Sequence, residues 1–143
     1  MARSIVAVLL GTLFGSFVTL VVMSIGEALV PTPEGFRIDD PNAAAQLLPA
    51  HFVNVLLAWG AGSFAGAFLA SYFSTQRQVA HGLAVGCILL IFGIVQLTRI
   101  PHPTWFAVVG VLLFLPAAWA GASAQSLKLP GSHEGWIVAN EDR

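Results

Sequence analysis

Four long apolar stretches dominate this chain and limit what it can fold into. They cover residues of about 4–30, 51–73, 79–98 and 104–122. The hydrocarbon core of a bilayer is about 30 Å thick, and a helix of about 20 apolar residues crosses it while satisfying its own backbone hydrogen bonds. The sequence therefore predicts an all-α integral membrane four-helix bundle over residues 1–123, followed by a short cytoplasmic tail over residues 124–143.

The composition agrees with a place in a membrane. Of the 143 residues, 57% are hydrophobic and 9% are charged, whereas roughly 25% of the residues in soluble domains are charged. The net charge of −1 provides no basic surface for phosphates, so we exclude nucleic acid as a partner. The first stretch is longer than the apolar region of a secretory signal, and we interpret it as an uncleaved helix.

Prolines indicate where several of these helices begin and end. Pro49 and Pro103 stand at the starts of the second and fourth stretches, where a missing backbone N–H is tolerated. Pro31 and Pro33 follow the first stretch and predict its end. Pro116 lies inside the fourth stretch, so we expect a kink there unless that helix stops early.

The positions of the cations predict the orientation in the membrane. Arg3, Arg77 and Lys128 flank stretches on one side, and Arg37 and Arg99 lie on the other. Because cytoplasmic loops carry an excess of Lys and Arg, the side with three cations is the expected cytoplasmic side. Both termini are then cytoplasmic.

Small residues recur at four-residue spacing in three of the stretches. Association of helices in lipid depends on close approach of their backbones, which small residues permit. The pattern predicts tight helix contacts, either within one chain or between chains. The residues are Gly11, Gly15, Gly62, Gly66, Gly82 and Gly86.

A set of polar residues lies at one end of the predicted bundle. Ionisable residues within membrane segments are costly and often functional. In the predicted topology all six fall at the extracytoplasmic end and form a candidate polar cluster. One hypothesis is that they converge on a shared polar pocket. The six are Glu27, His51, Asn54, Gln96, Arg99 and His102.

The connection before the fourth stretch reads TRIPHPTW over residues 98–105. Pro101 and Pro103 restrict its backbone and favour an extended conformation for the residue between them. The alternative to a functional site is that this segment only connects two membrane helices. In that case Arg99 reaches to water, His102 faces solvent and Trp105 anchors at the lipid interface.

Two kinds of chemistry are open to such a pocket. Glu27 beside Arg99 would form an ion pair. Glu27, His51 and His102 could instead bind a transition metal, an option that we rank below the ion pair because no HxxxH or CxxC pattern supports it. We also find no hydrolase or phosphate-loop motif. We therefore predict neither catalytic residues nor a cofactor.

The chain resembles a family of small four-helix bacterial inner-membrane proteins of unassigned function. The likeness rests on Glu27, on LLAW at residues 56–59 followed by Gly62 and Gly66, and on Pro-His-Pro-x-Trp at residues 101–105. The resemblance implies a four-helix fold and a bacterial inner membrane, but no activity. The architecture alone is also similar to that of small multidrug-resistance transporters, whose first helix carries an essential glutamate.

Three functions follow as hypotheses. The first is a non-enzymatic accessory or structural subunit of a membrane complex or a homo-oligomer, in contact with lipid and with other membrane subunits or copies of itself. The second is a small proton- or cation-coupled transporter or permeation subunit gated by Glu27, His51 and His102. The third is a metal- or cofactor-binding membrane protein.

Overall fold

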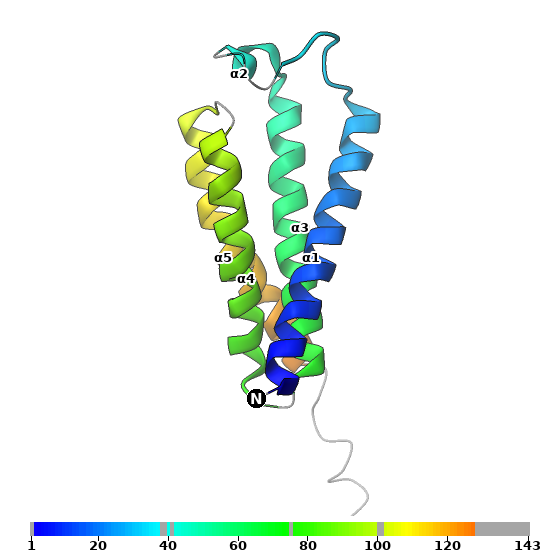
Figure 1. The fold of residues 1–143 in the computed structure, drawn as a ribbon, viewed down its shortest axis with the longest axis vertical. Helices are drawn as coiled ribbons and strands as arrows, with labels where there is room; N and C mark the ends of the chain where they lie inside the picture. The colour runs from blue at the N-terminus through cyan, green and yellow to red at the C-terminus, as the bar shows by residue number, and fades with distance from the viewer. Residues whose placement is uncertain (1, 38–39, 41, 75, 100–101, 128–143) are drawn as a thin grey trace, which may run out of the picture.

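The four predicted membrane helices are present in the computed structural model, which describes residues 2–37, 40, 42–74, 76–99 and 102–127. The elements are α1 (Ala2–Leu29), α2 (Ala43–Gln46), α3 (Pro49–Phe73), α4 (Gln78–Arg99) and α5 (Thr104–Ser126). The long helices run alternately up and down in one bundle (Figure 1). Each is long and apolar enough to cross a membrane. The all-α four-helix bundle is therefore confirmed, and the chain is a multi-pass membrane protein.

The ends of the helices follow the prolines in part. Pro49 is the first residue of α3, and Pro103 is the residue that caps α5. Helix α5 continues through Pro116 to Ser126, so it does not stop early. Residues 128–143, which make up most of the predicted tail and include Lys128, lie outside the described part of the chain.

Helices α1 and α3 touch through their backbones. A Cβ added to Gly11 would lie 2.6 Å from the carbonyl oxygen of Gly66, and one added to Gly15 would lie 2.6 Å from that of Gly62. The hydroxyl of Thr19 occupies the space beside Gly62. The glycines of this pair thus form contacts within one chain, and a role in contacts between chains stays a prediction.

Helices α4 and α5 form a second close pair. A Cβ on Gly82 would lie 2.5 Å from the Cβ of Ala122, and one on Gly86 would lie 2.5 Å from that of Ala118. Helix α3 joins the two pairs: the buried hydroxyl of Ser63 donates a hydrogen bond of 2.8 Å to the carbonyl of Phe114 on α5. All six predicted packing glycines therefore lie at helix contacts within the chain.

The bundle is not equally tight along its length. Helix α1 meets α4 near the end where the chain begins, at Gly11 with Val85 and at Gly15 with Leu89. Toward the end that carries α2, which we call the α2 end, the two helices diverge (Figure 1). The bundle contacts of α1 involve α3 and α4, and helix α5 packs on α3 and α4. This divergence leaves room between α1 and α4 in the half of the bundle nearer α2.

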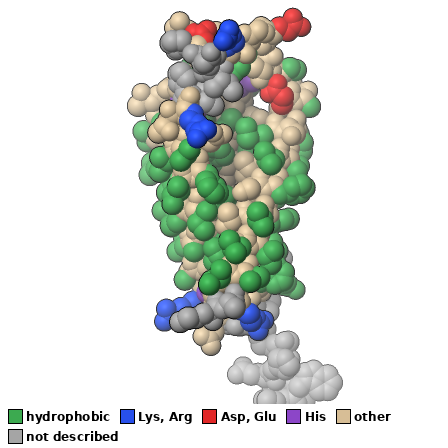
Figure 2. Space-filling view, viewed as in Figure 1, with side chains coloured by type: hydrophobic (Ala, Val, Ile, Leu, Met, Phe, Trp, Pro, Cys, Tyr) green, Lys and Arg blue, Asp and Glu red, His purple; other side chains and the backbone are tan. Residues whose placement is uncertain are grey.

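Polar and apolar side chains divide along the long axis. Figure 2 shows an apolar belt around the middle, Lys and Arg side chains at both ends, and acidic side chains at the α2 end. The described carboxylates of Glu27, Glu34 and Asp40 all belong to that end. Arg3 and Arg77 belong to the opposite end, which we call the basic end.

Candidate functional site

The strongest candidate site is a pocket of about 210 Å³ at the α2 end. Four of the six predicted polar residues line it: Glu27 from α1, His51 and Asn54 from α3, and His102 from the segment before α5. Gln96 lines a different cavity. Arg99 ends α4 and is exposed, and it lines neither space.

Glu27 binds the loop rather than a cation. Its Oε1 accepts a hydrogen bond of 2.8 Å from the backbone N–H of Thr32, and its Oε2 accepts one of 2.9 Å from the Thr32 hydroxyl. Both carboxylate oxygens thus have a partner five residues along the chain. The predicted ion pair with Arg99 is wrong for these two described residues, because α1 and α4 diverge at this end (Figure 1).

His51 connects the start of α3 with the end of the first helix. Its Nδ1 accepts a hydrogen bond of 3.1 Å from the backbone N–H of Leu48, and its Nε2 lies 3.3 Å from the carbonyl oxygen of Pro31. A neutral imidazole that carries its proton on Nε2 satisfies both contacts. The ring therefore caps a helix and holds the loop, in addition to lining the pocket.

His102 belongs to an aromatic column between α3 and α5. Its ring stacks on Phe106 at a centroid distance of 4.9 Å and an interplanar angle of 10°. Phe106 then contacts Trp59 at 5.6 Å, and Trp59 contacts Phe114 at 5.2 Å. The rings of Phe52 and Phe106 also lie 5.4 Å apart. His102 is thus part of a packed wall and not simply a solvent-facing turn residue.

Asn54 sits where α1 and α3 come together at the α2 end. Its side chain fills the space that a Cβ on Gly26 would occupy, and its Nδ2 lies 3.5 Å from the carbonyl oxygen of Met23. The amide is therefore a polar contact between the two helices beside the pocket. Its neighbour Gly26 was not among the predicted packing glycines.

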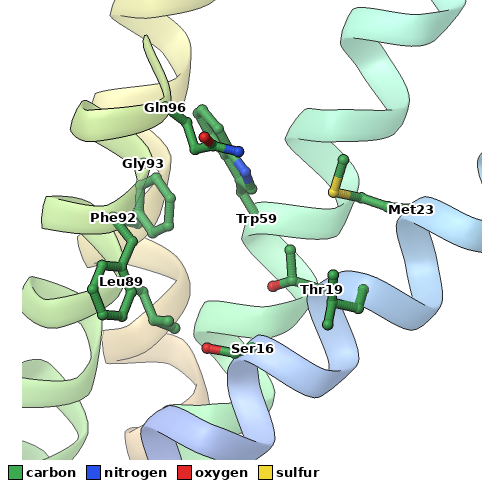
Figure 3. Close-up of a pocket in the computed structure, with 10 residues that line it drawn as sticks. Ser16, Thr19, Met23, Trp59, Leu89, Phe92, Gly93 and Gln96 are labelled. Carbon is green, nitrogen blue, oxygen red and sulfur yellow. The ribbon is translucent and has the colours of Figure 1, made fainter. Parts of the chain in front are cut away.

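A second cavity, which we call the cleft, opens between α1 and α4 and has a volume of about 230 Å³. Figure 3 shows Ser16, Thr19 and Met23 of α1 on one side, Gln96 of α4 on the other, and Trp59 of α3 between them. The Thr19 hydroxyl is 3.0 Å from the carbonyl of Gly15, in its own helix. Met23 lines both the cleft and the pocket.

The pocket does not have the donor set of a metal centre. Among the described residues, no group of three His, Cys, Asp or Glu side chains could hold a metal ion. Glu27 and His51 direct their polar atoms at Thr32, Leu48 and Pro31. The pocket thus combines a few polar groups with aromatic rings.

Sequence reasoning missed several residues of these two spaces. Nothing in the sequence pattern singles out Thr32 as the partner of Glu27. The aromatic column could have been found, because Phe52 and Trp59 are seven residues apart and Phe106 and Phe114 are eight apart. Both separations return a residue to about the same face of a helix after two turns.

Comparison of the chain with models of protein families, with curated proteins and with solved structures finds no match. The comparisons therefore identify no family for this chain. The structure establishes a bundle of four helices of membrane-spanning length.

Proposed function

We propose that this chain is a non-enzymatic integral membrane protein that acts as an accessory or structural subunit of a membrane complex or a homo-oligomer. The observation that carries the proposal is an apolar stripe on α1. The stripe lies on the face of α1 opposite the glycines, and its members are between 42% and 67% exposed. They are Val6, Leu10, Leu13, Phe17 and Leu20.

The spacing of this stripe suits another helix. Its members alternate between steps of four and three residues, which is the seven-residue repeat of helices that pack by inserting side chains into one another. Most transmembrane helix pairs cross with the same shallow left-handed geometry. Over the most apolar 18-residue stretch of each long helix, α1 also has the smallest buried share. The exposed stripe is therefore suited to a partner in the plane of the membrane.

The distribution of ionisable residues supports a role without catalysis. No Asp, Glu, Lys, Arg or His occurs in residues 4–26, 52–76, 82–98 or 103–127. Proton relays and ion pathways in membranes are built from such groups at depth. The Asp, Glu, Lys, Arg and His residues of this chain therefore lie outside the middle of its membrane helices, which favours contact with other components over chemistry in the membrane interior.

The family of the protein and its orientation in the membrane are part of the same proposal. The Pro-His-Pro-x-Trp motif and the glycines of α3 support membership of the small four-helix family of bacterial inner-membrane proteins. In the sequence, Arg3, Arg77 and Lys128 flank the membrane stretches on one side against Arg37 and Arg99 on the other, and this majority supports a cytoplasmic position for the basic end.

Cysteine crosslinking in native membranes tests the subunit role. In a Cys87→Ser background, Leu13→Cys should give a discrete crosslinked adduct, either a dimer or a larger species with another protein. Leu112→Cys is the matched control, because Leu112 on α5 and Leu13 are both 67% exposed. Monomer at both positions, together with a monomeric protein in mild detergent, would contradict the proposal.

The pocket and the cleft favour one alternative, a small proton- or cation-coupled transporter or permeation subunit. The two spaces share Met23 in their linings. Under this alternative, Glu27→Gln should reduce proton or cation flux in reconstituted vesicles. Glu34→Gln, in the loop after α1, should not. Equal flux in both variants removes the proposed role of Glu27.

A further inference from the structure

The basic end of the bundle contains a cavity that the proposed function does not use. It has a volume of about 300 Å³ and lies between the start of α1 and the connection from α3 to α4. Three of its lining residues can carry positive charge: Arg3, Arg77 and His81. We call this space the basic pocket.

Among the residues that the structure describes, no carboxylate balances the positive charge at this pocket. Its lining contains no acidic side chain, and the acidic residues that the structure describes belong to the opposite end of the bundle. Figure 2 shows the same separation, with Lys and Arg at the basic end and no acidic side chain among the coloured atoms there. The described part of the chain therefore presents a positive field to an anion in this pocket.

Local hydrogen bonds hold the backbone of Arg77 close to His81. Arg77 has a φ angle of 51°, a left-handed conformation that costs about 1 kcal/mol in a residue with a side chain. Its carbonyl accepts a hydrogen bond of 3.2 Å from the backbone N–H of His81 and lies 3.0 Å from the His81 Nδ1. The same Nδ1 lies 3.0 Å from the hydroxyl of Ser74. Arg77 and His81 are thus held together at the start of α4.

An apolar groove adjoins the basic pocket. This second space has a volume of about 310 Å³ and is lined by Ile5, Val8 and Leu9 together with Ser4 and His81, which it shares with the basic pocket. Ile5 and Leu9 are 61% and 56% exposed, so the groove faces the lipid. From Ile5 to Leu9 it follows α1 for about 6 Å, toward the middle of the membrane.

We infer that this end of the protein binds an anionic phospholipid, with its phosphate at Arg3 and Arg77 and one acyl chain along the groove of Ile5, Val8 and Leu9. Guanidinium groups form paired hydrogen bonds with phosphate oxygens. Basic pockets between transmembrane helices bind anionic headgroups. A free phosphate would use only the charged half of this site, whereas a lipid also uses the apolar half.

Lipid binding to the purified protein tests the inference. After removal of native lipid in a neutral detergent, native mass spectrometry should show phosphatidylglycerol bound at least about tenfold more tightly than phosphatidylcholine, and this preference should fall as salt rises. Inorganic phosphate should not compete at similar concentrations. Equal binding of the two lipids overturns the inference, and so does competition by phosphate as strong as that by the lipid.

Charge-removing variants locate the site. Arg77→Asn keeps a residue that tolerates the left-handed conformation, and Arg3→Gln removes the second cation without touching the strained position. Each should weaken phosphatidylglycerol binding about fivefold, with the thermal midpoint of the lipid-free protein as the check on folding. Arg99→Gln removes the same charge at the other end of α4 and should leave binding unchanged. If Arg99→Gln weakens binding as much as the other two, the attraction is general and the site is refuted.

Discussion

Substituting Gly66 by alanine should separate α1 from α3 and destabilise the bundle. A Cβ at this position would lie 2.6 Å from the carbonyl oxygen of Gly11 and 3.1 Å from both the Cα of Gly15 and a methyl of Val85. Ordinary contact begins at 3.4 Å, so the nearest contact is about 0.8 Å too short. Because the neighbour is backbone, it cannot turn aside as a side chain would.

The expected cost is that of overpacking a close-packed interior, about 1 to 3 kcal/mol. At about 2 kcal/mol the equilibrium between folded and unfolded protein shifts roughly 30-fold, since 1.4 kcal/mol corresponds to a factor of ten. Unfolding of the purified protein by a denaturing detergent in mixed micelles, followed by tryptophan fluorescence and helical circular dichroism, measures this shift.

Gly60→Ala is the matched control on the same helix. There an added Cβ would meet the flexible side chain of Leu113 at 3.3 Å, which can move away. Alanine is also the better helix former by up to about 1 kcal/mol, so this variant should be as stable as the parent or more so. If Gly66→Ala proves no less stable than Gly60→Ala, the backbone contact between α1 and α3 does not carry the stability assigned to it.

Three further predictions address other parts of the molecule. Ser63→Ala removes the buried hydrogen bond to Phe114 and should lower the free energy of unfolding by about 1 kcal/mol, measured by the same titration; an unchanged stability would show that the hydroxyl is not needed there. Thr32→Val removes one of the two hydrogen bonds to Glu27, so amide hydrogen exchange in the loop after α1 should speed up while exchange in the middle of α3 stays slow. Gln76→Cys in a Cys87→Ser background should react with a membrane-impermeant maleimide from the cytoplasmic side, and reaction from the other side would reverse the proposed orientation.

The fold followed from the sequence because length and hydropathy decide which segments span a membrane. The depth of each residue is then fixed by its place in its segment, and an even number of crossings brings Glu27, His51 and His102 to one end. The glycine spacing predicted close contacts because a residue without a side chain lets a neighbouring backbone approach, as Gly11 and Gly66 do.

The sequence did not predict which helices pack side by side in the bundle. Helices α1, α3 and α5 are apolar on nearly every face, so their periodicity does not indicate which neighbour each face meets. Gln96 and Arg99 share the depth of the other polar residues, but they lie on α4, which diverges from α1 at that end. The partner of Glu27 is Thr32 because the loop folds back on the helix, and a loop conformation is not encoded in hydropathy.

The backbone contact of α1 with α3 and the aromatic column between α3 and α5 together determine how the cleft behaves. Where Gly11 faces Gly66 and Gly15 faces Gly62, the backbones of α1 and α3 cannot move apart by a change of rotamer. One wall of the cleft, α1, is thus held on α3, and Trp59 of the packed aromatic column lines the space between the two walls. A hydrocarbon chain or side chain that enters should meet a space already shaped to receive it, so its affinity is not reduced by the free energy of reorganising the protein.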